Sequence, residues 1–384
     1  MRILLTGGGS GGHITPLLAV ARELKSLRPG IELIGVCEQG AAFVHLFEDS
    51  EYIDSVRQVS AGKYRRYAGL KWYQRWFDIK TLLLNLRDVR RTLKGYREAK
   101  KLLRELKPDG LLIKGGFVAV PLGRAAAKLG VPYLTHDSDS VPGLANRLIA
   151  GQAAVHATGM PAELYSYPQA KTIYTGIPVS DAFTKVTPSL RAVYREALGL
   201  SGCSRVITVV GGSQGAGQLN QDMVSLAGRL MQRFENLGIV HVAGRAHETE
   251  VRKRYNEELL ADEARRVVVQ GFIGTIYQSQ GAADVVITRA GATQVAELSL
   301  QALPIIVVPG LLAGGHQDKN AAFLEGKGAA LQVRHADAEG LYAAIELLLT
   351  DKDKAASLGA GLHALAKPEA AKELAVTTLG VLEK

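Results

Sequence analysis

The stretch "LLTGGGSGGH" (Leu4–His13) decides the fold, because a short apolar run breaks there into glycines around a serine. A second stretch, "TVVGGSQGAG" (Thr208–Gly217), repeats this pattern in the other half of the chain, without a histidine at its end. Glycines let the backbone turn sharply, and a helix that follows such a turn directs unpaired N–H groups at a ligand. Each stretch therefore predicts a strand, a glycine turn and a helix that together form a site for an anion.

Short apolar runs alternate with segments of helical periodicity on both sides of these turns. In the first half "RILLTG" precedes the helical pattern "TPLLAVARELKSL", and "LLIK" precedes a further glycine pair, Gly115–Gly116. In the second half "RVITVVGG" precedes "LNQDMVSLAGRLMQRF". Strands that alternate with helices form parallel sheets with crossover helices. We predict an α/β fold made of two Rossmann-like, doubly wound domains.

The length of 384 residues also favours two domains. Residues 175–189 hold two prolines and few large apolar side chains, so we place the linker there. The predicted domains are residues 1–178 and residues 179–384, with a last helix at 368–384 that could fold back onto the first domain.

The composition excludes several classes of protein. No run of about eighteen apolar residues is present, so no membrane-spanning helix is expected. The first residues run directly into a strand, so no signal peptide is expected. The two cysteines, Cys37 and Cys203, are far apart, which indicates a reducing compartment and neither a disulfide framework nor a zinc cluster. We expect no metal ion and no cofactor.

The first glycine turn also contains the pattern G-x-G-x-x-G, as Gly7, Gly9 and Gly12, and Glu38 ends the next strand. This outline is typical of dinucleotide-binding enzymes, but alone it is a weak signal, and a turn without a ligand has the same outline. His13 places a titratable side chain at the mouth of the turn, and the second domain repeats the turn. One dinucleotide site does not explain both features.

The second half contains side chains that suit a sugar nucleotide. Glu297 lies about one turn into the helix after "TRAG", where a carboxylate can accept two hydrogen bonds from a ribose diol. Gln317 and Asn320 share one face of a helix, and amides both donate to and accept from sugar hydroxyls. A glutamate on an exposed helix face and a capped helix start are the alternatives.

Six motifs in this order resemble the peptidoglycan N-acetylglucosaminyltransferase (MurG) family over roughly residues 1–330. They are "GGGSGGHITP", "GGF", "HDSDSVPGLANR", "GGSQGAGQLN", "RAGATQVAE" and "GHQDKNA". The resemblance implies a glycosyltransferase B (GT-B) fold, with the lipid acceptor on the N-terminal domain and UDP-GlcNAc on the C-terminal domain. It also implies an inverting transfer of N-acetylglucosamine to the 4-hydroxyl of lipid-linked muramyl-pentapeptide, which converts lipid I to lipid II.

The resemblance assigns residues to both substrates. The residues implied for the donor are Gly212, Ser213, Gln214, Ile273, Arg289, Ala292, Thr293, Glu297, Gln317, Asn320 and Asp139. The residues implied for the acceptor are Ser10, Gly11, Gly12, Gly115, Gly116, Phe117 and Asn146. The attacking hydroxyl needs a general base, and we expect His13 in this role, with Asp137 as the second candidate. A His13 that only orients the acceptor or the loop is the alternative.

Several positions depart from the family pattern. Asp137 stands where a glutamate is usual, and Asp139 replaces an asparagine expected to touch the donor sugar. Ile177 and Ser180 replace an asparagine and an arginine. These departures keep open another UDP-sugar glycosyltransferase of the same fold, acting on a glycolipid or a small metabolite, and a non-catalytic nucleotide-sugar-binding scaffold.

The segment from Lys63 to Arg104 carries fourteen basic and three acidic residues, and so the whole excess of the +9 net charge. Its first part interleaves these cations with the aromatic residues Tyr64, Tyr67, Trp72, Tyr73, Trp76 and Phe77. This composition suits an anionic membrane surface, although nucleic acid or a solvated helix face would use the same residues. Given a lipid-linked acceptor, we expect a peripheral protein on the cytoplasmic face of the cell membrane, with cell-wall synthesis proteins as further candidate partners and no nucleic acid.

Overall fold

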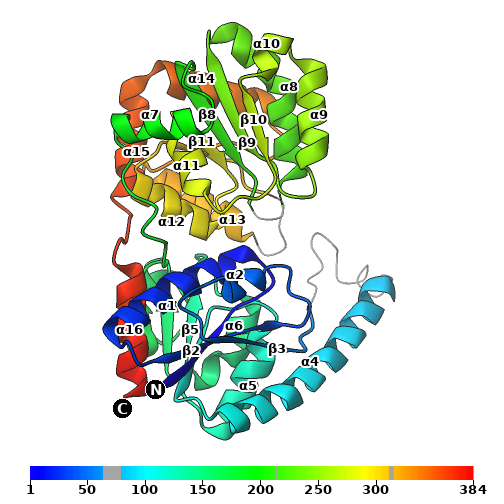
Figure 1. Ribbon diagram of the computed structural model, residues 1–384, viewed down its shortest axis with the longest axis vertical. Helices are drawn as coiled ribbons and strands as arrows, with labels where there is room; N and C mark the ends of the chain where they lie inside the picture. Colours follow the sequence, from blue (N-terminus) through cyan, green and yellow to red (C-terminus); the bar gives the residue numbers. More distant parts are fainter. Residues whose placement is uncertain (64–78, 213–214, 311–314, 384) are drawn as a thin grey trace. The chain divides into compact units, whose positions relative to one another are not determined.

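The computed structural model describes residues 1–63, 79–212, 215–310 and 315–383. The chain forms two compact units: Met1–Ser180 together with Lys367–Lys384 is unit 1, and Asp181–Ala366 is unit 2 (Figure 1). Each unit contains one parallel sheet with helices between its strands. The predicted α/β fold with two Rossmann-like sheets is therefore confirmed.

The sheet of unit 1 has seven strands in the order β3-β2-β1-β4-β5-β6-β7. Its strands are β1 (Arg2–Thr6), β2 (Glu32–Glu38), β3 (Ser55–Val59), β4 (Gly110–Ile113), β5 (Tyr133–Asp137), β6 (Val155–Thr158) and β7 (Thr172–Tyr174). The central strands β1, β4 and β5 are almost entirely buried, which explains their unbroken apolar runs.

Helices cover both faces of this sheet. They are α1 (Thr15–Leu27), α2 (His45–Glu48), α4 (Ile79–Leu106), α5 (Ala119–Leu129), α6 (Leu144–Ile149) and α16 (Ala370–Leu382), with short 3₁₀ turns η1 (Gly11–His13), η2 (Ala150–Gln152), η3 (Ala162–Leu164) and η4 (Gln169–Lys171). The C-terminal helix α16 lies along α1, and α4 packs against α5 (Figure 1). The chain therefore leaves unit 1 after Ser180 and returns to it with its last helix.

The sheet of unit 2 has six strands in the order β10-β9-β8-β11-β12-β13. Its strands are β8 (Arg205–Val210), β9 (Leu237–Val242), β10 (Val267–Gln270), β11 (Val285–Thr288), β12 (Ile305–Val307) and β13 (Leu331–Gln332). Its helices are α7 (Pro188–Ala197), α8 (Gly217–Arg233), α9 (Glu248–Glu258), α10 (Ala261–Ala264), α11 (Ile276–Gly281), α12 (Ala292–Gln301), α13 (His316–Gly326), α14 (Ala338–Thr350) and α15 (Lys352–His363).

The strand order reverses at one place in each sheet. In unit 1 this switch point lies between β1 and β4, and in unit 2 it lies between β8 and β11. In open parallel sheets, ligands bind in the crevice outside the carboxyl ends of the strands at such a point. Both repeated glycine turns of the sequence directly follow a switch-point strand, β1 and β8.

The basic helix α4 is fixed to the edge of the sheet through the residues that follow β3. The Ser60 backbone N–H donates to Glu98 Oε2 at 2.6 Å, and the Ser60 hydroxyl donates to Glu98 Oε1 at 3.2 Å. One turn earlier Gly95 is buried, and a Cβ at this position would lie 1.7 Å from the Ser60 carbonyl oxygen. The glycine therefore allows α4 to approach this strand end closely.

We predict that Gly95→Ala destabilises the protein although it improves helix propensity. Alanine gains about 1 kcal/mol over glycine inside a helix, but a methyl group at this distance forces α4 away from Ser60, which costs about 1–3 kcal/mol or more. Thermal and urea unfolding followed by circular dichroism measure the difference. The matched control is Gly380→Ala in α16, where a Cβ meets nothing within 4 Å, and which should be neutral or stabilising. Equal stability changes for the two variants would contradict the predicted clash.

Candidate active site

The first glycine turn is held by the strand next to it. The Gly7 N–H donates to the Val36 carbonyl at 3.2 Å, and the Gly9 N–H donates to Glu38 Oε1 at 2.8 Å. Gly9 has a φ of 82°, which lies in the left-handed region that favours glycine. Glu38 therefore binds the turn itself, which differs from the ribose-binding role that the dinucleotide outline would give it.

The turn after β4 lies directly against the first one. A Cβ on Gly116 would lie 2.2 Å from the Gly8 carbonyl oxygen, so only glycine fits there. A Cβ on Gly9 would lie 3.3 Å from the Phe117 ring. The structure thus brings together the two loops that the resemblance assigns to the acceptor, Ser10–Gly12 and Gly115–Phe117.

His13 lies in η1 with its ring directed at the second loop. His13 Nδ1 lies 2.6 Å from the Gly8 carbonyl oxygen, which can only accept, so Nδ1 carries the proton and Nε2 keeps a free lone pair. A Cβ on Gly115 would lie 3.7 Å both from His13 Nε2 and from Asn146 Oδ1. Burial, followed by the charge of Lys114, lowers the pKa of His13 to about 4, so the imidazole is neutral at physiological pH.

Asn146 lies in α6 and is almost completely buried. Its Nδ2 donates to the His136 carbonyl at 3.0 Å, and its Oδ1 has no hydrogen-bond partner among the described residues. A buried acceptor without a partner is costly. This oxygen, which like His13 Nε2 lies next to Gly115, can therefore accept a hydrogen bond from an N–H or O–H of a substrate.

The loop after β5 carries the second candidate base. Asp137 Oδ1 accepts from the Gly143 N–H and Oδ2 accepts from the Tyr167 hydroxyl, both at 2.8 Å. Burial raises the pKa of this carboxyl. Each carboxylate oxygen already accepts one hydrogen bond, whereas His13 Nε2 has a lone pair next to Gly115, so the geometry favours His13 over Asp137 as the candidate base. Asp139 lies in unit 1, and its carboxylate acts to raise the pKa of His13.

Two further departures from the family pattern lie at the end of the first segment of unit 1. Ile177 is buried, and a Cβ on Gly159 would lie 2.4 Å from its Cγ1, so the apolar side chain belongs to the core of unit 1. Ser180 is exposed at the end of unit 1.

In unit 2 the second glycine turn has the same backbone design. Gly212 and Gly215 have φ values of 84° and 76°, and the Gly215 N–H donates to the Gly212 carbonyl at 2.9 Å. Arg289 follows β11 directly and donates from Nη1 to the Gly215 carbonyl at 3.1 Å. The predicted donor residues Ser213 and Gln214 lie outside the described residues.

Glu297 lies in the second turn of α12, which begins at Ala292. Burial raises the pKa of the Glu297 carboxyl to about 7, and the Gln280 amide, 3.5 Å from Oε2, opposes the shift. A carboxyl group in this state exchanges its proton near neutral pH. Glu297 is half-buried, so the alternative interpretation, a glutamate on an exposed helix face, does not fit.

The two amides of α13 hold backbone loops. Asn320 is fully buried and its Nδ2 donates to the Ala290 carbonyl at 3.1 Å, while Gln317 Oε1 accepts from the Gly310 N–H at 2.8 Å. Ala290 has a φ of 60°, so the Asn320 bond supports a strained turn before α12. Thr293 in α12 and Ile273 after β10 are half-buried.

Sequence reasoning missed Lys114, the residue between β4 and Gly115. It is only 3 % exposed, and its Nζ donates to Ser138 Oγ at 2.5 Å. The signal was present, because a lysine inside an apolar run directly before a glycine pair is unusual for a buried strand end. Within the described ranges, no group of three or more His, Cys, Asp or Glu side chains could hold a metal ion.

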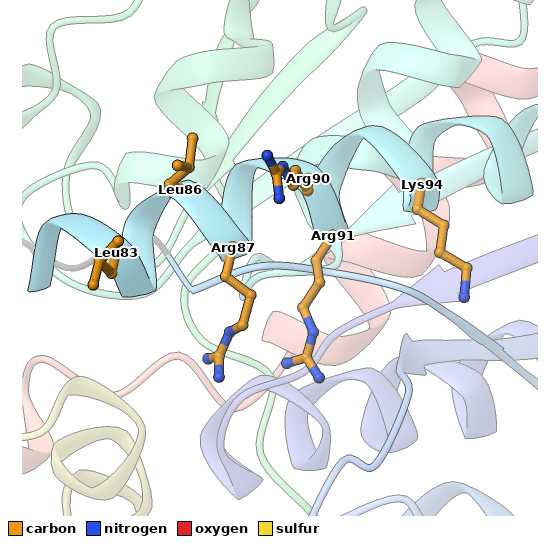
Figure 2. A pocket seen from close by; sticks show the side chains of 6 residues that line it. All are labelled: Leu83, Leu86, Arg87, Arg90, Arg91 and Lys94. Carbon is orange, nitrogen blue, oxygen red and sulfur yellow. The ribbon is translucent and has the colours of Figure 1, made fainter. Parts of the chain in front are cut away.

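Apart from Lys63, the described residues of the basic segment Lys63–Arg104 lie in helix α4. A groove of about 370 Å³ follows this helix and is lined by Leu83, Leu86, Arg87, Arg90, Arg91 and Lys94. Figure 2 shows Arg87, Arg91 and Lys94 extending from one side of the helix. The side chains of Leu83 and Leu93 are 62 % and 59 % exposed. The predicted aromatic residues from Tyr64 to Phe77 lie outside the described residues.

Comparison with known proteins agrees with this architecture. Residues 3–157 match the glycosyltransferase family 28 N-terminal domain, and residues 206–374 match the family 28 C-terminal domain. The crystal structure of Acinetobacter baumannii MurG superposes with a TM-score of 0.68 over 99 % of both chains, at 24 % identity. That likeness concerns the fold, which is the GT-B fold expected from the motifs.

Two curated relatives extend the match to the whole chain. A protein of Listeria welshimeri is 30 % identical over 100 % of both chains, and one of Bacillus thuringiensis is 30 % identical over 97 % of both. Both carry the name UDP-N-acetylglucosamine–N-acetylmuramyl-(pentapeptide) pyrophosphoryl-undecaprenol N-acetylglucosamine transferase, the second with the number 2. The chain therefore belongs to this family of N-acetylglucosamine transferases, as its six ordered motifs predict.

Proposed function

We propose that this protein transfers N-acetylglucosamine from UDP-GlcNAc to the 4-hydroxyl of lipid-linked muramyl-pentapeptide, and so converts lipid I to lipid II. The observation that carries the proposal is the 30 % identity to a transferase of that name over the full length of both chains. The two switch-point glycine turns supply the two anion sites that a reaction between two diphosphate-bearing substrates needs.

Unit 1 binds the acceptor in this proposal. The acceptor diphosphate lies against the Ser10–Gly12 and Gly115–Gly116 backbone, where the positive end of the α1 dipole is directed. Phe117 borders the same loops, and Asn146 Oδ1 accepts a hydrogen bond from the sugar or its N-acetyl group.

Unit 2 binds the donor. The Gly212–Gly215 turn with Ser213 and Gln214 holds the UDP diphosphate, aided by Arg289 and the N-terminus of α12 at Ala292 and Thr293. Glu297 accepts from the ribose hydroxyls, and the Ile273 backbone meets the uracil. Gln317 and Asn320 shape the sugar pocket through the loops that they hold.

The chemical step is a displacement with inversion. The 4-hydroxyl oxygen attacks the anomeric carbon, the bond from that carbon to the diphosphate oxygen breaks, and UDP leaves with the electron pair. His13 Nε2 takes the hydroxyl proton, because Nδ1 is already committed to Gly8. The negative charge of bound diphosphates stabilises imidazolium and so raises the pKa of His13 toward a useful value during turnover.

Helix α4 is the membrane-facing element of the proposal, on the cytoplasmic face. Its cations suit anionic lipid headgroups, and its exposed leucines suit the boundary of the acyl chains. Among the described helices, none combines the length and the apolar character needed to cross a bilayer.

We predict that His13→Gln lowers kcat by about 10²-fold or more, because the hydroxyl proton has no acceptor in the variant. The assay is UDP release from UDP-GlcNAc on addition of a lipid I analogue, with an acceptor-free control. Binding of UDP-GlcNAc, measured by calorimetry, should be unchanged, since His13 lies in unit 1. Asp137→Asn serves as the comparison and should keep most of the turnover. The reverse ranking of the two variants would assign the base to Asp137.

We predict that affinity for UDP-GlcNAc falls as the pH drops through about 7. The raised pKa of Glu297 means that the carboxyl is protonated below this pH, and a protonated carboxyl loses accepting capacity for the ribose diol. Each pH unit below the transition weakens binding by up to about tenfold. Glu297→Gln should bind weakly at every pH, whereas Glu325→Gln, on an exposed position of α13, should keep the wild-type profile. A pH-independent affinity in the wild type would remove Glu297 from the donor site.

We predict that the protein binds vesicles containing anionic lipid, and that binding weakens as salt is added. Replacing Arg87, Arg91 and Lys94 by alanine should reduce vesicle affinity by about 10²-fold at low salt, at about 1 kcal/mol for each cation. The charge-matched control replaces Lys253, Arg265 and Lys319, exposed cations of unit 2, and should bind like the wild type. Sedimentation with vesicles measures both. Equal losses in the two variants would show that net charge alone, rather than α4, drives binding.

A further inference from the structure

We propose that Lys114 is a positioning residue of the acceptor site, whose buried ammonium group contacts the Asp137–Asp139 loop at Ser138 and sets the electrostatic environment of the His13 imidazole. The inference rests on the proposed function, because it concerns the residue proposed there as the base.

The position of Lys114 is fixed by the sheet. Its backbone N–H donates to the Thr6 carbonyl at 2.8 Å, which extends the β1–β4 pairing by one residue. The side chain is therefore held between the end of β1, which leads to His13, and the loop after β5. Its Nζ reaches that loop at Ser138 Oγ, between the two aspartates. At 3 % exposure, an ammonium group needs compensating partners.

The charges around Lys114 provide this compensation. Burial lowers the pKa of Lys114 to about 8, and Asp137 and Asp139 raise it in opposition. The ammonium form therefore persists at neutral pH because two carboxylates lie close to it. A neutral side chain of similar length would leave these two carboxylates without a nearby cation from β4.

The groups that face His13 come from four elements. Two of these groups are uncharged: the Gly8 carbonyl, after β1, and the Asn146 amide, in α6. The two charged groups are Lys114, after β4, and Asp139, after β5. Glu38, at the end of β2, binds the turn itself at Gly9. Of the charged groups, Lys114 lowers the pKa of His13 and Asp139 raises it, with Lys114 the larger of the two. Lys114 also lowers the pKa of His136, which precedes the loop. One cation thus disfavours imidazolium at both histidines.

Unit 2 has a cation at the equivalent topological position. Arg289 directly follows β11, as Lys114 directly follows β4, and each of these strands lies across the switch point from a glycine-turn strand. Arg289 is bound to its glycine turn at Gly215, whereas Lys114 is bound to the aspartate loop at Ser138. Because Lys114 contacts the aspartate loop rather than the glycine turn, its position supports an electrostatic role next to Asp137 and Asp139.

The test is a titration of the His13 imidazole by NMR, with its signal assigned from the spectrum of His13→Gln. In the wild type the imidazole should stay neutral from pH 8 down to about pH 5. In Lys114→Met its pKa should rise by about one pH unit or more, into the measured range, because the opposing cation is lost and Asp139 remains. Lys114→Gln, which keeps a hydrogen bond to Ser138, should give the same rise if the methionine variant does not fold. Lys114→Arg should restore the wild-type titration.

The matched control is Lys128→Met, which removes the same charge from an exposed position of α5 and should leave His13 unchanged. In transferase assays, the acid limb of the kcat profile should move to higher pH in Lys114→Met by the amount seen in the titration, because protonated His13 cannot act as a base. A folded Lys114→Met or Lys114→Gln protein whose His13 titrates as in the wild type would overturn the inference. An inactive wild type would overturn the proposed function instead, since the imidazole titration needs no turnover.

Discussion

The close approach of two glycine turns at the switch point of unit 1 is the constraint on which its site depends. Gly116 lies so near the Gly8 carbonyl that a Cβ would be 2.2 Å from it, and Gly7 is equally restricted, since its Cβ would lie 2.3 Å from the His13 carbonyl. A side chain at Gly116 would separate the two turns, and a side chain at Gly7 would displace the His13 backbone within the first turn. Because the two turns touch, Nε2 of His13 faces Gly115 and Asn146, and the buried Lys114 stays within electrostatic range of the same ring. The backbone contact thus determines how close the proposed anion site lies to His13, the proposed base.

The same construction in unit 2 supports different chemistry. There too a glycine turn follows the first switch-point strand and a cation follows the second, but the cation bonds the turn directly, from Arg289 to Gly215. The turn ends in Gly217 and α8, with no histidine. Instead, unit 2 has Glu297 in α12, and amides of α13 that hold the loops at Gly310 and Ala290. In the proposed function both units use the glycine turn as a phosphate site, and the side chains at the ends of the strands distinguish the unit that activates a hydroxyl from the one that binds a nucleotide.

The sequence predicts the buried parts of this arrangement well. Strands β1, β4 and β8 lie in apolar runs that lead into glycine turns, and the sequence predicts all three. The edge strands β3 and β7 are short and only partly buried, with polar residues inside, so no pattern of hydrophobicity distinguishes them from loops. The sequence also cannot show that β4 lies beside β1, because about a hundred residues separate them. For this reason Lys114, whose importance depends on that neighbour, was missed, while His13, which lies inside a motif, was not.

The different cations of the two units fit the different demands of the two reactants. The departing diphosphate of the donor gains negative charge, and a guanidinium group, which keeps its charge at any physiological pH, suits it. The acceptor side must deprotonate a hydroxyl, so its imidazole has to begin the reaction neutral. Lys114 disfavours the imidazolium form of His13, whereas carboxylates without a nearby cation would favour imidazolium before the hydroxyl proton is transferred. In the proposed reaction this lysine is partly offset by Asp137 and Asp139, and a bound diphosphate would favour the imidazolium form of His13 as the hydroxyl proton is transferred.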